Sequence, residues 1–149
     1  MIAEIVLLSI GVLGVIIASI TDIKSREIPD WLCYSMIFSG LGIRTIISLS
    51  SLTYWPLLEG LIGFGIFFLV ANLMYYTKQW GGGDSKLLMG LGAIFGNGLE
   101  ILHLQNAKPF TLSFFLNLFI IGALYGLALT ICIAFKHRRK IFQEIQKEK

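Results

Sequence analysis

Five long apolar segments fill most of the 149-residue chain and leave it few ways to fold. They lie at about residues 1–20, 31–52, 57–76, 87–104 and 110–135. A helix needs about 20 mostly apolar residues to span the hydrocarbon core of a bilayer, and each segment is close to that length. Only 14% of the residues are charged, whereas soluble domains carry about 25%. We therefore predict an all-α fold, a polytopic transmembrane helix bundle with about five membrane helices.

The bundle is predicted to be one membrane-embedded domain, residues 1–149, that ends in a basic cytoplasmic tail at 136–149. The first segment has the length of a signal peptide, but a signal peptide carries its basic residues before the apolar run. Here the early charge is Glu4, and Lys24 and Arg26 come after the run. We therefore expect residues 1–20 to be a retained first helix.

The basic residues predict how the bundle is oriented. If the loop after the first segment is cytoplasmic, so are Lys24, Arg26, Lys78, Lys86, Lys136, Arg138, Arg139, Lys140, Lys147 and Lys149. Only Arg44 and Lys108 then fall in the outer half. Because cytoplasmic loops are enriched in Lys and Arg, we predict the amino terminus outside and the carboxyl terminus inside. The basic cluster next to a membrane helix favours membrane lipid over nucleic acid as its partner.

Several side chains within the apolar segments have structural explanations. Cys33 and Cys132 are expected to be packed thiols, since the sequence has no CxxC and no recognisable zinc-ligand spacing. Arg44 and Glu59 are expected to pair with each other or to reach toward the outer membrane surface. The small residues Gly92 and Gly96 are spaced to let helix backbones approach closely.

Two aspartates at segment edges are the candidates for chemistry. Asp22 follows the first segment, and Asp84 precedes the fourth. An ionisable carboxyl at the edge of a membrane segment is costly and indicates a functional site. Because two apolar segments separate the aspartates, both are expected at the same membrane face. Two carboxyls that can meet at one face are the minimum that an aspartic hydrolase needs.

The first aspartate belongs to the stretch Asp-Ile-Lys-Ser-Arg-Glu-Ile-Pro-Asp at residues 22–30. Pro29 cannot continue a helix and biases Ile28 toward an extended conformation. We therefore predict a helix end, a short loop and a new helix with Asp30 as its N-cap. Taken alone, Asp22 and Asp30 are as well explained as loop and cap carboxylates.

The second aspartate follows three glycines at residues 81–83. Glycine permits backbone conformations closed to other residues and lets another chain approach. An extended substrate can therefore lie against Gly81 and Gly83, beside Asp84. Lys86 either orients substrate, tunes Asp84 or contacts lipid headgroups. The stretch lacks the GxxxxGK[ST] spacing of a phosphate-binding loop.

Together the two motifs resemble those of the type IV prepilin peptidases and archaeal preflagellin peptidases, the GxGD family of membrane aspartic proteases. That family shows an aspartate, five residues, then Ile-Pro-Asn, and residues 22–30 match with Asp30 in place of Asn. The family also shows Gly-x-Gly-Asp and then a Lys-Leu pair one residue on. Residues 81–87 match this, with Ser85 in place of a small aliphatic residue.

The resemblance implies a leader peptidase of a prokaryotic plasma membrane. Its catalytic pair would be Asp22 and Asp84 at the cytoplasmic face, and no metal or organic cofactor is expected. Its partners would be leader-bearing pilin-like or archaellin-like precursors, and whether a homodimer forms stays open. Larger bacterial members also methylate the product, by a cytoplasmic region with CxxC motifs. This sequence shows no such region, so we expect no methyl transfer.

Three other functions stay open on the sequence alone. Presenilin or signal-peptide-peptidase proteins also use a GxGD aspartate, but they resemble this chain less. They carry their first aspartate after tyrosine, whereas Thr21 precedes Asp22 here. A non-enzymatic membrane assembly component is a further alternative, as is a small transporter. A transporter favours polar residues near the membrane midplane and an internal repeat, and neither is evident.

Overall fold

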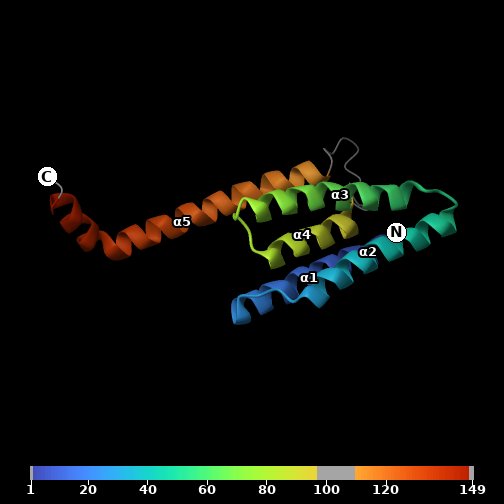
Figure 1. The fold of residues 1–149 in the computed structure, drawn as a ribbon, viewed down its shortest axis with the longest axis horizontal. Coiled ribbons are helices and arrows are strands. Elements are labelled where there is room, and N and C mark those ends of the chain that lie inside the picture. The colour runs from blue at the N-terminus through green and yellow to red at the C-terminus, as the bar shows by residue number, and fades with distance from the viewer. Residues whose placement is uncertain (1, 97–109, 148–149) are drawn as a thin grey trace. The chain divides into compact units, whose positions relative to one another are not determined.

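The computed structural model describes residues 2–96 and 110–147, and Figure 1 shows that this part of the chain is built from helices. The helices are α1 (Ile2–Ser25), α2 (Asp30–Ser51), α3 (Trp55–Tyr76), α4 (Gly82–Phe95) and α5 (Phe110–Lys147). The predicted all-α fold is confirmed.

Four described stretches are long and apolar enough to cross a membrane. They are Ile2–Ser25, Asp30–Ser51, Trp55–Tyr76 and Thr111–Lys136. These stretches match four of the five predicted segments, so the chain has the make-up of a multi-pass membrane protein. Exposed aromatic rings lie near both ends of the helices, Trp31 at the start of α2 and Tyr76 at the end of α3, with Tyr54 and Trp55 at the opposite end. Such rings favour the two membrane–water interfaces.

The fourth segment differs from its prediction. We expected a loop at residues 81–83 and a helix over 87–104, but α4 begins at Gly82 and has 14 residues. Glycine is unfavourable in the interior of a helix. Its free-energy cost is smaller in the first turn, where the N–H groups have no helical partner in any case. Residues 97–104 of the predicted segment lie outside the described part of the chain.

The fifth helix is longer than predicted and belongs to a unit of its own. The chain divides into two compact units, Met1–Thr111 and Leu112–Lys149. We expected the last helix to end at residue 135, but α5 continues as a helix to Lys147. Lys, Arg, Gln and Glu favour helix, so the basic tail extends α5. Cys33 is buried, which confirms the expectation of a packed thiol for it, and Cys132 is exposed within its own unit.

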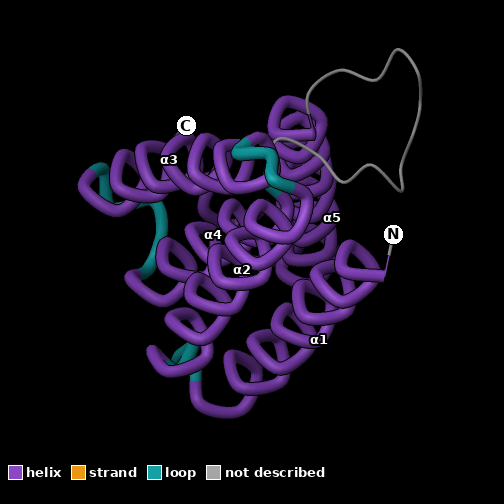
Figure 2. The backbone as a smooth tube through the Cα atoms, turned by 90° about the vertical axis from the view of Figure 1, so that its right-hand side faces the viewer, coloured by secondary structure: helices purple, strands orange, loops and turns teal. Residues whose placement is uncertain are grey.

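Within the first unit, α4 lies among the other helices. It contacts α1, α2 and α3, and both views place it between α2 and α3 (Figures 1 and 2). Seven of its residues are buried, Ser85, Leu88, Gly90, Leu91, Gly92, Ala93 and Ile94. By contrast, α1 buries a single stripe, Leu7, Gly11, Gly14 and Ala18. Because the outer helices bury one stripe each, most of their apolar side chains are left to face lipid.

Glycines allow α4 to lie this close to its neighbours. A Cβ at Gly92 would be 2.8 Å from the carbonyl oxygen of Gly63 on α3, and a Cβ at Gly63 would collide with Gly96. A Cβ at Gly40 on α2 would be 2.9 Å from the backbone of Ala93 and Ile94. The predicted close approach at Gly92 and Gly96 is therefore confirmed, and α4 packs nearly backbone to backbone.

Candidate active site

One cavity of about 560 Å³ lies where the end of α1 meets the starts of α2 and α4. It is lined by Asp22, Ser25, Arg26, Glu27, Ile28, Pro29, Asp30, Gly81, Gly82, Gly83, Asp84 and Lys86. The structure thus brings the two predicted catalytic aspartates and the three predicted substrate-binding residues around one cavity, although α2 and α3 separate the two motifs in the sequence.

Asp22 lies in the last turn of α1, and its side chain is exposed toward this cavity. The helix ends because Arg26 adopts a left-handed conformation, with φ of 56°. The Arg26 N–H still donates to the carbonyl oxygen of Asp22, at 2.8 Å. Pro29 then begins α2 as its N-cap, with ψ of 132°. The prediction of Asp30 as the N-cap is therefore wrong, because the fixed φ of proline already suits the position before the first helical residue.

Asp84 lies in the first turn of α4, and its side chain is also exposed. The N–H groups of a first turn have no helical partner, and the helix dipole favours a carboxylate there. A Cβ at Gly81 would be 3.3 Å from Oδ2 of Asp84. A side chain at residue 81 would therefore crowd this carboxylate, and glycine avoids that contact.

Gly83 has a different conformation from the predicted one. We expected a loop glycine, but Gly83 is helical, and Gly96 is the only described glycine with positive φ. The predicted role of Gly83 in substrate binding stays a prediction. A Cβ at Gly83 would be 3.0 Å from Cβ of Ile28 and 3.4 Å from its backbone nitrogen. The buried Cys33 thiol also lies 3.9 Å from the Gly83 carbonyl oxygen, which accepts its hydrogen bond. Gly83 therefore lets the start of α4 pack against the loop that follows Asp22.

Sequence reasoning missed Ile28 and Cys33 as parts of the site. The available signal for Ile28 was its place before Pro29, which restricts its backbone to extended conformations. For Cys33 no local signal existed, because its partner Gly83 is 50 residues away in the sequence.

Lys86 is engaged by Asp30. Its Nζ donates a hydrogen bond to Oδ1 of Asp30 at 2.7 Å, and it lies 5.7 Å from the centre of the Tyr34 ring. The hydrogen bond to Asp30 raises the pKa of Lys86, which favours its ammonium form. The pair ties the start of α2 to the first turn of α4, and the expected contact of Lys86 with substrate or lipid headgroups stays a prediction.

The cavity lining carries more acidic than basic groups. Asp22, Glu27, Asp30 and Asp84 are acidic, whereas Arg26 and Lys86 are basic. The four carboxyls against two cations give a net charge of −2 when all are ionised. Two exposed carboxyls that face one cavity can hold and activate a water molecule, and the excess negative charge favours a cationic ligand.

Comparison with known proteins places these features in a family. Residues 9–127 match the model of the type IV leader peptidase family. The preflagellin peptidase of Methanococcus voltae is 35% identical over 136 residues, which cover 87% of this chain and 57% of the relative. The preflagellin peptidases of Methanococcus maripaludis and Methanocaldococcus jannaschii are 32% and 29% identical. The alignment with the Methanococcus maripaludis protein covers 86% of this chain and 57% of that relative. The alignment with the Methanocaldococcus jannaschii protein covers 94% of this chain and 70% of that relative.

The chain therefore spans little more than half the length of two of these relatives. No solved structure matches it. The family match covers most of the sequence and includes most of α1, all of α2, α3 and α4, and the first part of α5. On this match, the chain belongs to the type IV leader peptidase family.

Proposed function

We propose that the protein is an aspartic endopeptidase that removes the leader peptide of preflagellin-like or prepilin-like precursors. The observation that carries the proposal is that Asp22 and Asp84, from the first and fourth helices, line one cavity at one end of the helical unit. Membership in the type IV leader peptidase family supports this reaction. The names of the three relatives support a preflagellin-like substrate.

In the proposed mechanism the two carboxyls act as a pair on one water molecule. The mechanism requires one carboxyl to be ionised and the other to be protonated. The ionised carboxyl takes a proton from water as the water oxygen attacks the carbonyl carbon of the scissile bond. The protonated carboxyl meanwhile donates a hydrogen bond to the carbonyl oxygen. The carboxyl that took the proton from water then passes it to the leaving nitrogen as the C–N bond breaks. Either aspartate can take either role.

The cavity also supports a substrate with a cationic leader. Its net negative lining attracts basic residues that precede the cut. Its place at the helix ends lets the apolar helix of a precursor stay in the bilayer while the scissile bond enters the cavity. Gly81 leaves room beside Oδ2 of Asp84, where an extended peptide can lie.

Co-expression with leader-bearing precursors tests the proposal. We expect a precursor with a basic leader to be shortened in membranes that contain the wild-type protein, as measured by gel mobility and by sequencing of the new amino terminus. A matched precursor whose basic leader residues are replaced by glutamine should be cut more slowly. The absence of a shortened product for preflagellin-like and prepilin-like precursors alike would overturn the proposal.

The proposal also places the site at the cytoplasmic face of a plasma membrane. Reporter fusions after Lys24, Lys78 and Phe135 should report a cytoplasmic location, and a fusion near Lys108 should report the outside. The ten basic residues on one side, against two on the other, are the reason for this expectation. Reporters that place the Lys24 and Lys78 loops on opposite faces would contradict a shared site for Asp22 and Asp84.

Asp30→Asn should be tolerated. The amide oxygen of asparagine still accepts a hydrogen bond from Lys86, and exposed ion pairs contribute little to stability. We expect cleavage within about threefold of wild type in membranes with equal amounts of protein. Asp30→Leu, which removes the acceptor, is the matched comparison and should lower cleavage more. A loss of cleavage in Asp30→Asn equal to that in Asp30→Leu would show that the charge of Asp30 matters beyond its bond to Lys86.

A further inference from the structure

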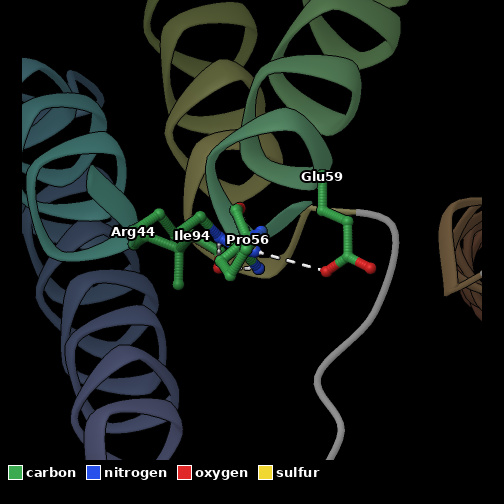
Figure 3. A network of polar contacts seen from close by, with 4 residues as sticks. All are labelled: Arg44, Pro56, Glu59 and Ile94. Carbon is green, nitrogen blue, oxygen red and sulfur yellow. Dashed lines mark hydrogen bonds and ion pairs between the residues drawn. The ribbon is translucent and has the colours of Figure 1, made fainter. Parts of the chain in front are cut away.

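Arg44 is a buried cation at the end of α4 opposite to Asp84. It is only 3% exposed. Its Nε and Nη2 donate to the carbonyl oxygen of Ile94 at 3.3 and 3.0 Å, and its Nη1 donates to that of Pro56 at 3.1 Å. Nη1 also lies 3.7 Å from Oε2 of Glu59 (Figure 3). The predicted pairing of Arg44 with Glu59 is confirmed, but the guanidinium lies inside the helical unit and joins α2 to both α3 and α4.

The surroundings of Arg44 are shaped to hold it. A Cβ at Gly60 on α3 would collide with Cδ of Arg44. A Cβ at Gly96 would be 2.8 Å from Nη2 and 3.0 Å from Cζ. Two glycines from different elements therefore make room for the aliphatic stem and the guanidinium. The Arg44 side chain is therefore held by fixed contacts along its length, unlike an arginine that extends to the membrane surface.

The main partner of Arg44 is the end of α4. The helix ends at Phe95, followed by Gly96 with φ of 57°. Carbonyl groups in the last turn of a helix have no helical donor, and the helix dipole favours a cation there. Arg44 directs two donors at one such carbonyl, Ile94. In an apolar environment this carbonyl would be costly to leave unpaired.

Arg44 helps to hold α4 along its axis. The close contacts of Gly40 and Gly63 hold α4 sideways between α2 and α3. The Lys86–Asp30 pair opposes sliding along the axis at the start of α4, and the bonds of Arg44 to Ile94 oppose it at the end. Asp84 and Ile94 lie on the same helix, about 15 Å apart along its axis. A shift of α4 at Ile94 therefore moves Asp84 by the same amount.

We infer that Arg44 is a positioning residue, which fixes α4 along its axis and so fixes the distance of Asp84 from Asp22. The inference rests on the proposed function for its effect on cleavage. Its structural part, the distance between the two aspartate positions, can be measured without any activity.

The distance is measured between spin labels on Asp22→Cys and Asp84→Cys, with Cys33 and Cys132 replaced by serine. In bilayers, Arg44→Met should shift or broaden the distance distribution by about 2 Å or more, which exceeds the rise of about 1.5 Å per helical residue. Arg44→Lys keeps the charge but has a single nitrogen to share between Ile94 and Pro56, so it should give an intermediate result. Thr45→Val is the matched control, because the Thr45 hydroxyl donates to Leu41 within α2, and its distribution should be unchanged. The same distribution in wild type and both Arg44 variants would overturn the inference.

Cleavage kinetics test the consequence for catalysis. Arg44→Met should lower kcat by about 10- to 100-fold with KM within about twofold, because a small displacement of a catalytic group is costly. Arg44→Lys, which keeps the charge and one donor, should recover part of the lost kcat. A merely structural loss would lower the amount of folded protein in the membrane, so kcat is expressed per folded protein, and an unchanged kcat on that basis would overturn the inference. If wild type cleaves no precursor, the proposed function fails, and the distance measurement still decides the role of Arg44.

Discussion

Asp22→Asn and Asp84→Asn should each lower leader cleavage by at least about 10³-fold while the protein still inserts into the membrane. Each change removes one of the two proposed catalytic carboxyls that line the cavity, and asparagine can neither take a proton from water nor donate one as an acid. The size of each side chain is kept, and both are exposed, so packing is little affected. The measurement is the rate of leader removal in membranes that contain equal amounts of each protein.

The double variant and a neighbouring carboxyl supply the controls. Residues that act as a unit give non-additive losses, so Asp22→Asn with Asp84→Asn should be no slower than either single variant. Glu27→Gln removes another carboxyl from the same cavity. It should leave kcat unchanged and raise KM by about two- to threefold, because it only weakens attraction of a cationic leader. Near-wild-type cleavage by either aspartate variant would show that the proposed mechanism is wrong.

Gly83→Val should reduce cleavage by about 100-fold or more. A Cβ at Gly83 would be 3.0 Å from Cβ of Ile28, which is too close, and the two branches of valine add further atoms. The start of α4 must then move away from the loop after Asp22, and Asp84 moves with it. The measurement is leader removal at equal protein amounts, together with the distance between labelled positions 22 and 84.

Gly82→Ala is the matched control for this prediction. It changes the preceding glycine in the same helical turn, where a Cβ would meet the Tyr75 ring at 3.6 Å, an ordinary van der Waals distance. Cleavage by Gly82→Ala should stay within about threefold of wild type. If Gly83→Val cleaves as well as Gly82→Ala does, the packing of Gly83 against Ile28 does not set the position of Asp84.

The sequence predicted the features that depend on the bilayer and on local chemistry. Bilayer thickness sets the length of an apolar helix, so α1, α2 and α3 lie close to their predicted bounds. An even number of intervening helices brings two segment edges to one face. That argument placed Asp22 and Asp84 together, and the structure has both on one cavity.

The features that sequence reasoning missed depend on partners distant in the chain. The three glycines indicated a loop, because the packing of Gly83 against Ile28 is visible only when α4 is in place. Arg44 was expected to pair with Glu59 or to reach toward the outer membrane surface, and the pairing is confirmed, but its burial was not predicted. Its burial depends on the Ile94 carbonyl, 50 residues away. Asp30 was assigned as an N-cap from local preference, but it binds Lys86, 56 residues away.

The central place of α4 bears on how the protein is made. The described helix has 14 residues, about 21 Å, which is shorter than the hydrocarbon core of about 30 Å. Many of its residues are glycine or alanine, so α4 transfers little apolar side-chain surface from water when it enters lipid alone. The stripes of α1, α2 and α3 that receive it precede α4 in the chain and are synthesised earlier. Entry of α4 is therefore the step that joins Asp84 to Asp22, and a nascent chain acquires its complete cavity only after three helices have been inserted.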